Sequence, residues 1–425
     1  MKRLLLMLII TGLLIAGCDS GGNTPEATAT LEPTIAPTPT YEPIKITIGN
    51  LTDMTGVSAN ALAFIDMSME DVIKHYNETG LIPGIELEMI SYDTQYNPAR
   101  FISGYEWLQE KGADVIWNAL PPGVPTLKSR ADEDKFPIFS ATANVDPEEL
   151  DGSYVFCLAV SPEYEAYTLL KWIAENDPDF PNDRPALIGG AAWNDAYSNI
   201  WFKAAEDYCT SHPDQYEWEK GYLTDMKFTW VTEVEGLKDC DYAYVPTPPQ
   251  NFMEEYRDAG YAAKFLGTEM HAAFNGMIDK AGLWDDIDGM LFILSGTWYN
   301  EENLMMNLCN RLLDVEHSER KAEEIRTSGS GYRSTARAYM VCDIIRDTVR
   351  RVGAENFCTE ALVETAKSWS FTYDGVEDFV NFSETKRFGQ DYYAIYRVEV
   401  DPTNPHSWQY ITRADPDWLF QVTEP

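Results

Sequence analysis

From Ile44 onward the chain alternates between short apolar segments and amphipathic segments, and this rhythm restricts its possible folds more than any other feature. Residues Ile44–Ile48 alternate apolar and polar side chains and run into Gly49-Asn50, which is typical of a strand followed by a loop. Apolar residues then recur every three or four positions until Gly80, which predicts a helix. Further strands are expected at residues 85–92, 115–117 and 138–139, with helices over residues 98–111 and 126–134. Strands that alternate with helices pair in parallel through right-handed crossovers, so this part predicts a doubly wound α/β sheet.

A second series of the same kind follows. Its strands are expected at residues 154–158, 186–188, 217–222, 242–245, 264–266 and 290–294, with helices between them. A long helix is then predicted over Tyr332–Val352, and the remaining segments at residues 376–382, 392–400 and 408–412 resemble short antiparallel strands. Two sheets of similar size imply two lobes with a cleft between them. In open α/β sheets ligands bind beyond the carboxyl ends of the strands, so the residues after each strand are the candidates for a site.

The N-terminus has the pattern of an export signal. Two basic residues precede the uncharged stretch Leu4–Ala16, which is too short to span a membrane because a spanning helix needs about 20 apolar residues. The segment Leu14–Cys18 (LIAGC) resembles the bacterial lipobox, in which cleavage leaves a lipidated cysteine as the first residue. We therefore predict a lipoprotein signal peptide over residues 1–17 and lipidation at Cys18. The alternative is a plain secretory signal with an incidental cysteine.

The segment after Cys18 is predicted to be a tether. Six Thr and five Pro occupy the 23 residues of Gly21–Pro43, which hold few large apolar side chains and cannot form a core. We expect residues 18–43 to space an exported domain from the outer face of the cell membrane. Six further cysteines follow, at positions Cys157, Cys209, Cys240, Cys309, Cys342 and Cys358. Six cysteines allow 15 pairings and none shows Cys-x-x-Cys spacing, so disulfides and buried thiols both remain open.

Charge and motifs exclude several functions. The chain has 32 Lys and Arg against 69 Asp and Glu, a net charge of −37 that repels phosphate backbones, so no nucleic-acid partner is expected. The nucleophile elbow, the phosphate loop and the zinc helix motif are absent from the sequence, so we expect no enzymatic activity, cofactor or metal. The five histidines are scattered, and His271 alone follows a predicted strand. We interpret Ser328–Gly331 as a linker and helix cap, because no strand precedes it.

Six segments next to predicted strands form a characteristic series. They are Ile48–Gly56 (IGNLTDMTG), Tyr92–Ala99 (YDTQYNPA), Phe136–Thr142 (FPIFSAT), Asn194–Tyr197 (NDAY), Phe265–Glu269 (FLGTE) and Tyr393–Tyr396 (YAIY). In this order and spacing they resemble the type I periplasmic solute-binding proteins, in particular the leucine/isoleucine/valine-binding receptors of ABC transporters. The resemblance extends over nearly all of residues 44–400.

The resemblance implies two α/β lobes joined by a hinge of three chain crossings. Lobe one would comprise residues 44–160 and 289–370, and lobe two residues 161–288 and 371–425. The crossings are then expected near Ser161, Asp288 and Phe371. Closure of the lobes around a solute would produce the form that a permease recognises.

The resemblance also implies solute-binding residues in lobe one. Amino-acid-binding members hold the solute carboxylate with a hydroxyl group and backbone amides after two strands. The residues that match one of these loops are Ser140, Ala141 and Thr142. The other loop is usually rich in serine but is Leu120–Val124 (LPPGV) here, which leaves the amides of Gly123 and Val124 as candidate donors. The alternative for Ser140–Thr142 is that they cap the helix that follows.

In lobe two, Glu269 matches the acidic residue that pairs with the solute ammonium group, and Tyr197 matches the aromatic residue beside it. A carboxylate in a dry cleft is costly unless a ligand ammonium group or several hydrogen-bond donors satisfy it, which favours Glu269 as a site residue. Where the family has Gly-Tyr after a strand, this chain has Pro246–Pro249 (PTPP), and we expect Trp193 to supply the missing aromatic wall. The alternatives are an exposed loop glutamate and a tryptophan of the core.

The predicted function is therefore a monomeric, lipid-anchored, non-enzymatic receptor. It would capture a small solute, an amino acid or a similar zwitterion, and deliver it to an ABC transporter permease. The alternative is a sensor that presents a small amide or aromatic solute to a membrane signalling partner. An extracellular hydrolase is the least favoured possibility, because no nucleophile and base pair is evident.

Overall fold

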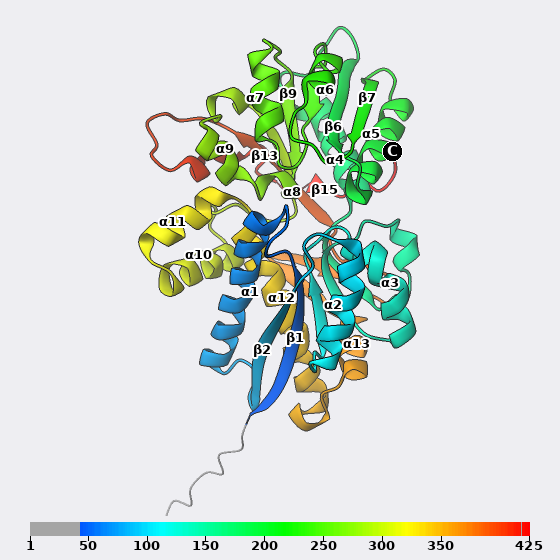
Figure 1. The fold of residues 1–425 in the computed structure, drawn as a ribbon, viewed down its shortest axis with the longest axis vertical. Helices are drawn as coiled ribbons and strands as arrows, with labels where there is room; N and C mark the ends of the chain where they lie inside the picture. The colour runs from blue at the N-terminus through cyan, green and yellow to red at the C-terminus, as the bar shows by residue number, and fades with distance from the viewer. Residues whose placement is uncertain (1–42, 418) are drawn as a thin grey trace, which may run out of the picture. The chain divides into compact units, whose positions relative to one another are not determined.

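The computed structural model describes residues 43–417 and 419–425 (Figure 1). The predicted signal peptide, Cys18 and nearly all of the predicted tether lie outside the described residues. In the described part of the chain, no helix combines the length and the apolar character needed to cross a membrane.

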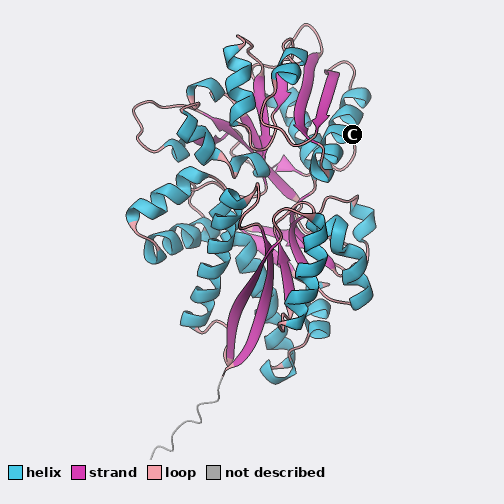
Figure 2. Ribbon diagram, viewed as in Figure 1, coloured by secondary structure: helices cyan, strands magenta, loops and turns pink. Residues whose placement is uncertain are grey.

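The first sheet has five parallel strands in the order β2-β1-β3-β4-β5. These strands are β1 (Ile44–Thr52), β2 (Ile85–Asp93), β3 (Val115–Asn118), β4 (Ile138–Thr142) and β5 (Val155–Val160). The connecting helices are α1 (Ala59–Thr79), α2 (Pro98–Glu110) and α3 (Gly123–Asp134), with the short turn η1 (Pro147–Leu150) before β5. Figure 2 shows helices on both sides of the strands. The doubly wound arrangement predicted for this part is confirmed.

Local sequence accounts for these helices. The apolar stripe of α1 buries Leu62, Met69 and Tyr76, and the helix ends at Gly80, whose φ of 62° is a left-handed conformation that glycine adopts without strain. Helix α2 begins with Pro98, and Asn97 Oδ1 accepts a hydrogen bond from the Ala99 amide at 3.0 Å.

The second sheet has the order β14-β13-β10-β9-β8-β6-β7, with β15 (Leu419–Phe420) paired to β13. Its parallel strands are β6 (Ala186–Trp193), β7 (Tyr216–Thr224), β8 (Tyr242–Tyr244), β9 (Lys264–Thr268) and β10 (Leu291–Leu294). The antiparallel additions are β13 (Tyr392–Val398) and β14 (Ile411–Arg413). The accompanying helical elements are α4 (Pro162–Asn176), α5 (Ala196–Ser211), α6 (Val231–Gly236), α7 (Gln250–Asp258), α8 (Glu269–Ala272), α9 (Asn275–Ala281), η2 (Asp285–Ile287) and η5 (Ser407–Tyr410).

A helical segment connects the two sheets between residues 304 and 366. It contains α10 (Leu304–Glu316), α11 (Glu319–Ser328), η3 (Gly331–Ser334), α12 (Thr335–Val352), η4 (Ala354–Asn356) and α13 (Thr359–Ala366). Helix α12 packs against α1, whereas α11 packs against α9. The small hairpin β11 (Ser370–Tyr373) and β12 (Val376–Asn381) follows.

The chain crosses between the sheets three times, and two crossings differ from the expected positions. The first lies at Ser161, between β5 and α4. The second follows Leu294 instead of lying near Asp288, because β10 pairs with β9 and β13 in the second sheet. The third lies near Gln390 instead of Phe371, because the β11–β12 hairpin packs on the first lobe: Phe371 stacks on Trp369, and the segment after β12 places Phe382 against Phe156. We therefore assign β10 to lobe two and the hairpin to lobe one.

The structure also distinguishes the alternatives for the cysteines. Cys209, Cys240, Cys309 and Cys342 are buried thiols, and Cys358 is an exposed thiol. Burial raises the pKa of Cys209, Cys240 and Cys309 to about 12. Cys157 is buried in β5. The five buried thiols are core side chains, and their apolar environment disfavours the reactive thiolate.

Candidate ligand-binding site

A partly open cavity of about 70 Å³ lies at the carboxyl ends of β3 and β4, between the two lobes. We call it the main cavity. Lobe one contributes Ser58, Ala61, Leu62, Ile65, Ala119, Leu120, Pro121, Ala141 and Thr142. The opposite wall is Glu269, Met270, Ala273 and Phe274, and the segment around η3 adds Ser330, Gly331, Ser334 and Arg337. Such a mainly apolar wall with a few polar groups is typical of a small-molecule site.

A second cavity, of about 40 Å³, adjoins the first. It shares Ser58, Pro121, Met270 and Phe274 with the main cavity and adds Trp193, Asp195 and Tyr197 from lobe two, among others. We call the two together the interlobe cleft.

The structure brings five of the eight predicted binding residues to this cleft. Ala141, Thr142 and Glu269 line the main cavity, and Trp193 and Tyr197 line the adjoining one. Trp193 is half-buried, and its Nε1 donates a hydrogen bond to the carbonyl of Lys227 at 2.9 Å. The Thr142 hydroxyl donates to Asn144 Oδ1 at 2.8 Å, so its oxygen remains an acceptor.

The other three predicted residues are committed to the fold. Ser140 is fully buried, and its Oγ lies 2.6 Å from the Thr142 carbonyl and 2.9 Å from Asn118 Nδ2. The Gly123 amide donates to the Leu120 carbonyl at 3.0 Å, and the Val124 side chain is fully buried in the core. The prediction that the Ser140 hydroxyl and the Gly123 amide face the solute is wrong, because the protein satisfies both groups itself, whereas the role of the Val124 amide stays a prediction.

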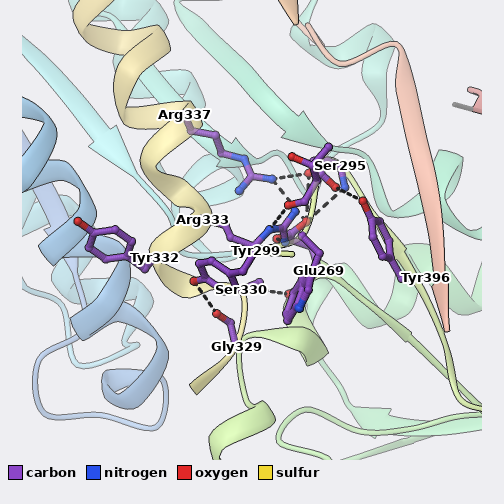
Figure 3. Close-up of polar contacts among 12 residues, drawn as sticks. Glu269, Ser295, Tyr299, Gly329, Ser330, Tyr332, Arg333, Arg337 and Tyr396 are labelled. Atoms are coloured by element: carbon purple, nitrogen blue, oxygen red, sulfur yellow. Dashed lines mark hydrogen bonds and ion pairs between the residues drawn. The ribbon is translucent and has the colours of Figure 1, made fainter. Parts of the chain in front are cut away.

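Glu269 occupies the cavity, but not as predicted. Its carboxylate accepts a hydrogen bond from Arg333 Nη1 at 3.0 Å, and Ser295 donates its backbone amide at 3.2 Å and its hydroxyl at 3.3 Å (Figure 3). Arg337 Nη2 lies 3.8 Å from the same carboxylate. Burial raises the pKa of Glu269, but the two arginines and Ser295 outweigh burial and the pKa is lowered. The carboxylate is thus ionised and its charge is compensated within the protein, so it does not require a solute ammonium group, and the predicted pairing with one stays a prediction.

Sequence reasoning missed these two arginines. Arg333 ends up 5% exposed, with its guanidinium 5.0 Å from the ring centroid of Trp298, and its Nε donates to the Thr297 carbonyl. Arg337 hydrogen-bonds the Ser295 hydroxyl. The available signal was their i, i+4 spacing at the start of a long helix, which puts two cations on one face.

The sequence and the fold of this chain are similar to those of known proteins. Residues 45–206 match the family described as periplasmic binding protein. No curated protein sequence matches the chain significantly. A solved branched-chain amino acid ABC transporter protein from Thermus thermophilus with bound valine is 17% identical, with a TM-score of 0.70, covering 84% of this chain and 94% of that chain. The chain has the fold of the type I periplasmic binding proteins.

Two further structures support the fold. A fatty acid ABC transporter substrate-binding protein from Thermomonospora curvata is 16% identical, with a TM-score of 0.70, covering 87% of this chain and 91% of that chain. A solute-binding protein from Rhodopseudomonas palustris in complex with 3,4-dihydroxybenzoic acid is 14% identical, with a TM-score of 0.69, covering 90% of this chain and 99% of that chain. The family resemblance and the two-lobed α/β fold predicted from the sequence are confirmed.

A buried polar network lies beneath the cleft. The Tyr197 hydroxyl hydrogen-bonds Glu165 and lies 3.0 Å from Thr268 Oγ1. Glu165 is fully buried, and this burial raises its pKa well above the usual value, which favours the neutral carboxyl group. Tyr197 therefore offers its ring to the cleft while its hydroxyl is held by the network.

His271 belongs to the same network and is structural. Its Nδ1 accepts a hydrogen bond from the Thr268 amide at 2.9 Å, and its Nε2 lies 2.8 Å from the Val245 carbonyl. Burial lowers the pKa of His271 to about 4, so the ring is neutral at pH 7.

Proposed function

We propose that this periplasmic binding protein captures a small solute in the interlobe cleft and delivers it to an ABC importer from the outer face of the membrane, where lipidated Cys18 holds it. The observation that carries this proposal is the main cavity, because residues of both lobes line it at the carboxyl ends of two strands. The three solved structures support it, since their titles name ABC transporters or solute binding.

Filling the cavity tests the proposal. The full chain is purified in detergent, and its thermal unfolding is measured against a panel of small acids, amino acids, amides and neutral solutes. A bound solute at 100 times its dissociation constant should stabilise the protein by about 2.7 kcal/mol. Ala141→Phe, which places a ring in the main cavity, should abolish this shift, whereas Ala99→Phe on the exposed start of α2 should retain it. A shift that persists in Ala141→Phe would place the solute elsewhere.

The anchor and the transport role have their own tests. Cys18→Ser should move the protein from the membrane fraction to the soluble fraction, because no acyl chains can then be attached. Cells without the protein should lose uptake of the stabilising solute. Unchanged uptake with a lost transcriptional response to the solute would instead favour the sensor.

A further inference from the structure

The charges around the main cavity do not balance. Arg333 and Arg337 contribute two positive charges against the single negative charge of Glu269. Glu165, the next acidic group in the network, does not line this cavity, and burial raises its pKa, which favours its neutral form. This excess of positive charge lies inside a chain whose net charge is −37, so its sign is opposite to that of the molecule as a whole.

Arg337 has hydrogen-bond donors to spare. A guanidinium carries five N–H donors. Among the described residues, the hydrogen bond recorded for Arg337 runs from Nη2 to the Ser295 hydroxyl, and its contact with Glu269 is a longer 3.8 Å. Its side chain is 12% exposed and lines the main cavity as well as a smaller cavity of about 20 Å³. Its remaining donors are therefore available to a bound group.

Ser334 adds a second donor at the same wall. It is the N-cap residue of α12 and is 3% exposed, yet its hydroxyl has no hydrogen-bond partner among the residues that the structure describes. Ser58, the N-cap residue of α1, likewise makes no side-chain capping bond and lines the cavity. Helix α1 and the continuous helical run of η3 and α12, which starts at Gly331, thus begin at the cavity, and the partial positive charge at their N-termini favours an anion there.

The other side chains that line the main cavity favour a solute with an apolar body. Leu62, Ile65, Leu120, Met270 and Phe274 surround the same space. A hydrophobic wall of this kind gains free energy by burying an aliphatic or aromatic group.

The carboxylate of Asp195 would favour a cationic solute, but it lies in the adjoining cavity. Asp195 lines that space, but its carboxylate accepts a hydrogen bond from the Ser198 amide at 2.9 Å as the cap of α5. Burial raises the pKa of Asp195 despite the hydrogen bonds from Ser198 and from the Tyr197 amide, which disfavours its charged form, so Asp195 does not call for a solute ammonium.

We infer that the solute is a small carboxylate anion with an apolar body, whose carboxylate is held by Arg337 and Ser334. This inference rests on the proposed function. It replaces the amino acid expected from the sequence with an acid that lacks the ammonium group, because Glu269 is already paired within the protein.

Matched sets of solutes test this inference in the full chain. One set is 4-methylpentanoate, leucine and 4-methylpentanamide, and the other is 3-phenylpropanoate, phenylalanine and 3-phenylpropanamide. Affinities are measured by calorimetry. In at least one set the acid should bind about tenfold or more tightly than the amide and the amino acid, since a hydrogen bond to a charged group contributes more than a neutral one.

Arg337→Met should weaken binding of the acid by about 10- to 100-fold and leave the amide unchanged. Arg350→Met, an exposed arginine on the same helix, is the matched control and should bind as the parent does. If Arg337→Met does not fold, Ser334→Ala should weaken the acid selectively. Equal losses for acid and amide would overturn the inference.

The remaining outcomes separate the two proposals. Tighter binding of an amino acid or a neutral solute than of the acids would overturn the inference and leave the receptor function standing. If no solute of the wider panel binds, the proposed function fails, and the inference fails with it.

Discussion

At the scale of single residues, His271 shows how the fold determines a protonation state. Its Nδ1 faces the Thr268 amide N–H, so a proton added there would point at another donor. The sequence placed this histidine after a strand, and its neighbours decide that it is neutral. Burial and an occupied acceptor both disfavour the charged ring.

His271 should make stability depend on pH. In the unfolded chain it binds a proton near pH 6.5, but in the folded protein only near pH 4, so the unfolded state gains the proton first as the pH falls. The free energy of unfolding should therefore drop by about 2 kcal/mol between about pH 7.5 and pH 5 from this residue. Urea unfolding of the parent and of His271→Gln at both pH values measures the difference.

The variant should lose this part of the pH dependence. Asp66, whose burial raises its pKa to about 6, acts in the opposite direction but equally in both proteins, so it cancels in the comparison. Parallel pH profiles for parent and variant would contradict the assignment of a neutral His271.

At the scale of elements, the loop before η3 shows what local patterns leave undetermined. Ser328–Gly331 reads as a linker and cap in the sequence, and in the structure Ser330 donates its amide to the Ala272 carbonyl at 2.9 Å. The loop thus joins η3 to α8 across the cleft. Gly329 has a φ of 117°, and a Cβ atom there would lie 1.8 Å from the Ala272 carbonyl oxygen.

Gly329→Ala should therefore destabilise the protein more than its backbone conformation alone explains. Gly152→Ala is the matched control, because Gly152 also has a positive φ of 69° but has open space around it. We expect the control to cost about 1 kcal/mol and Gly329→Ala to cost about 2 kcal/mol more, measured by urea unfolding. Equal losses would show that the contact with α8 does not constrain the loop.

At the scale of the whole molecule, a buried ion pair joins the lobes. Glu269 follows β9 of the second sheet, whereas Arg333 and Arg337 belong to the segment that packs on α1. Such a pair is costly to break, because the remaining charge stays buried without compensation.

Glu269→Gln should lower the free energy of unfolding by about 3 kcal/mol, since Arg333 then keeps its charge in a nearly dry site. Glu302→Gln, an exposed glutamate, is the control and should change stability by less than about 0.5 kcal/mol. Thermal and urea unfolding measure both. A Glu269→Gln variant as stable as the control would show that Arg333 does not depend on this carboxylate.

Much of this architecture was determined by the sequence itself. Strand and helix periodicity is a local property, so the alternating elements of both sheets and the helix starting at Pro98 were predictable. The family motifs also located Thr142, Tyr197 and Glu269 near one cleft, because the carboxyl ends of parallel strands meet at one edge.

Only the tertiary structure decided which strands pair and which charged side chains meet. The pairing of β10 and the packing of the β11–β12 hairpin depend on contacts distant in sequence, which periodicity does not report. The same holds for Glu269: the charge of this residue is visible in the sequence, but the arginines that neutralise it come from another lobe. Electrostatics acts through space, so the sign of the charge that a solute meets was decided by the fold.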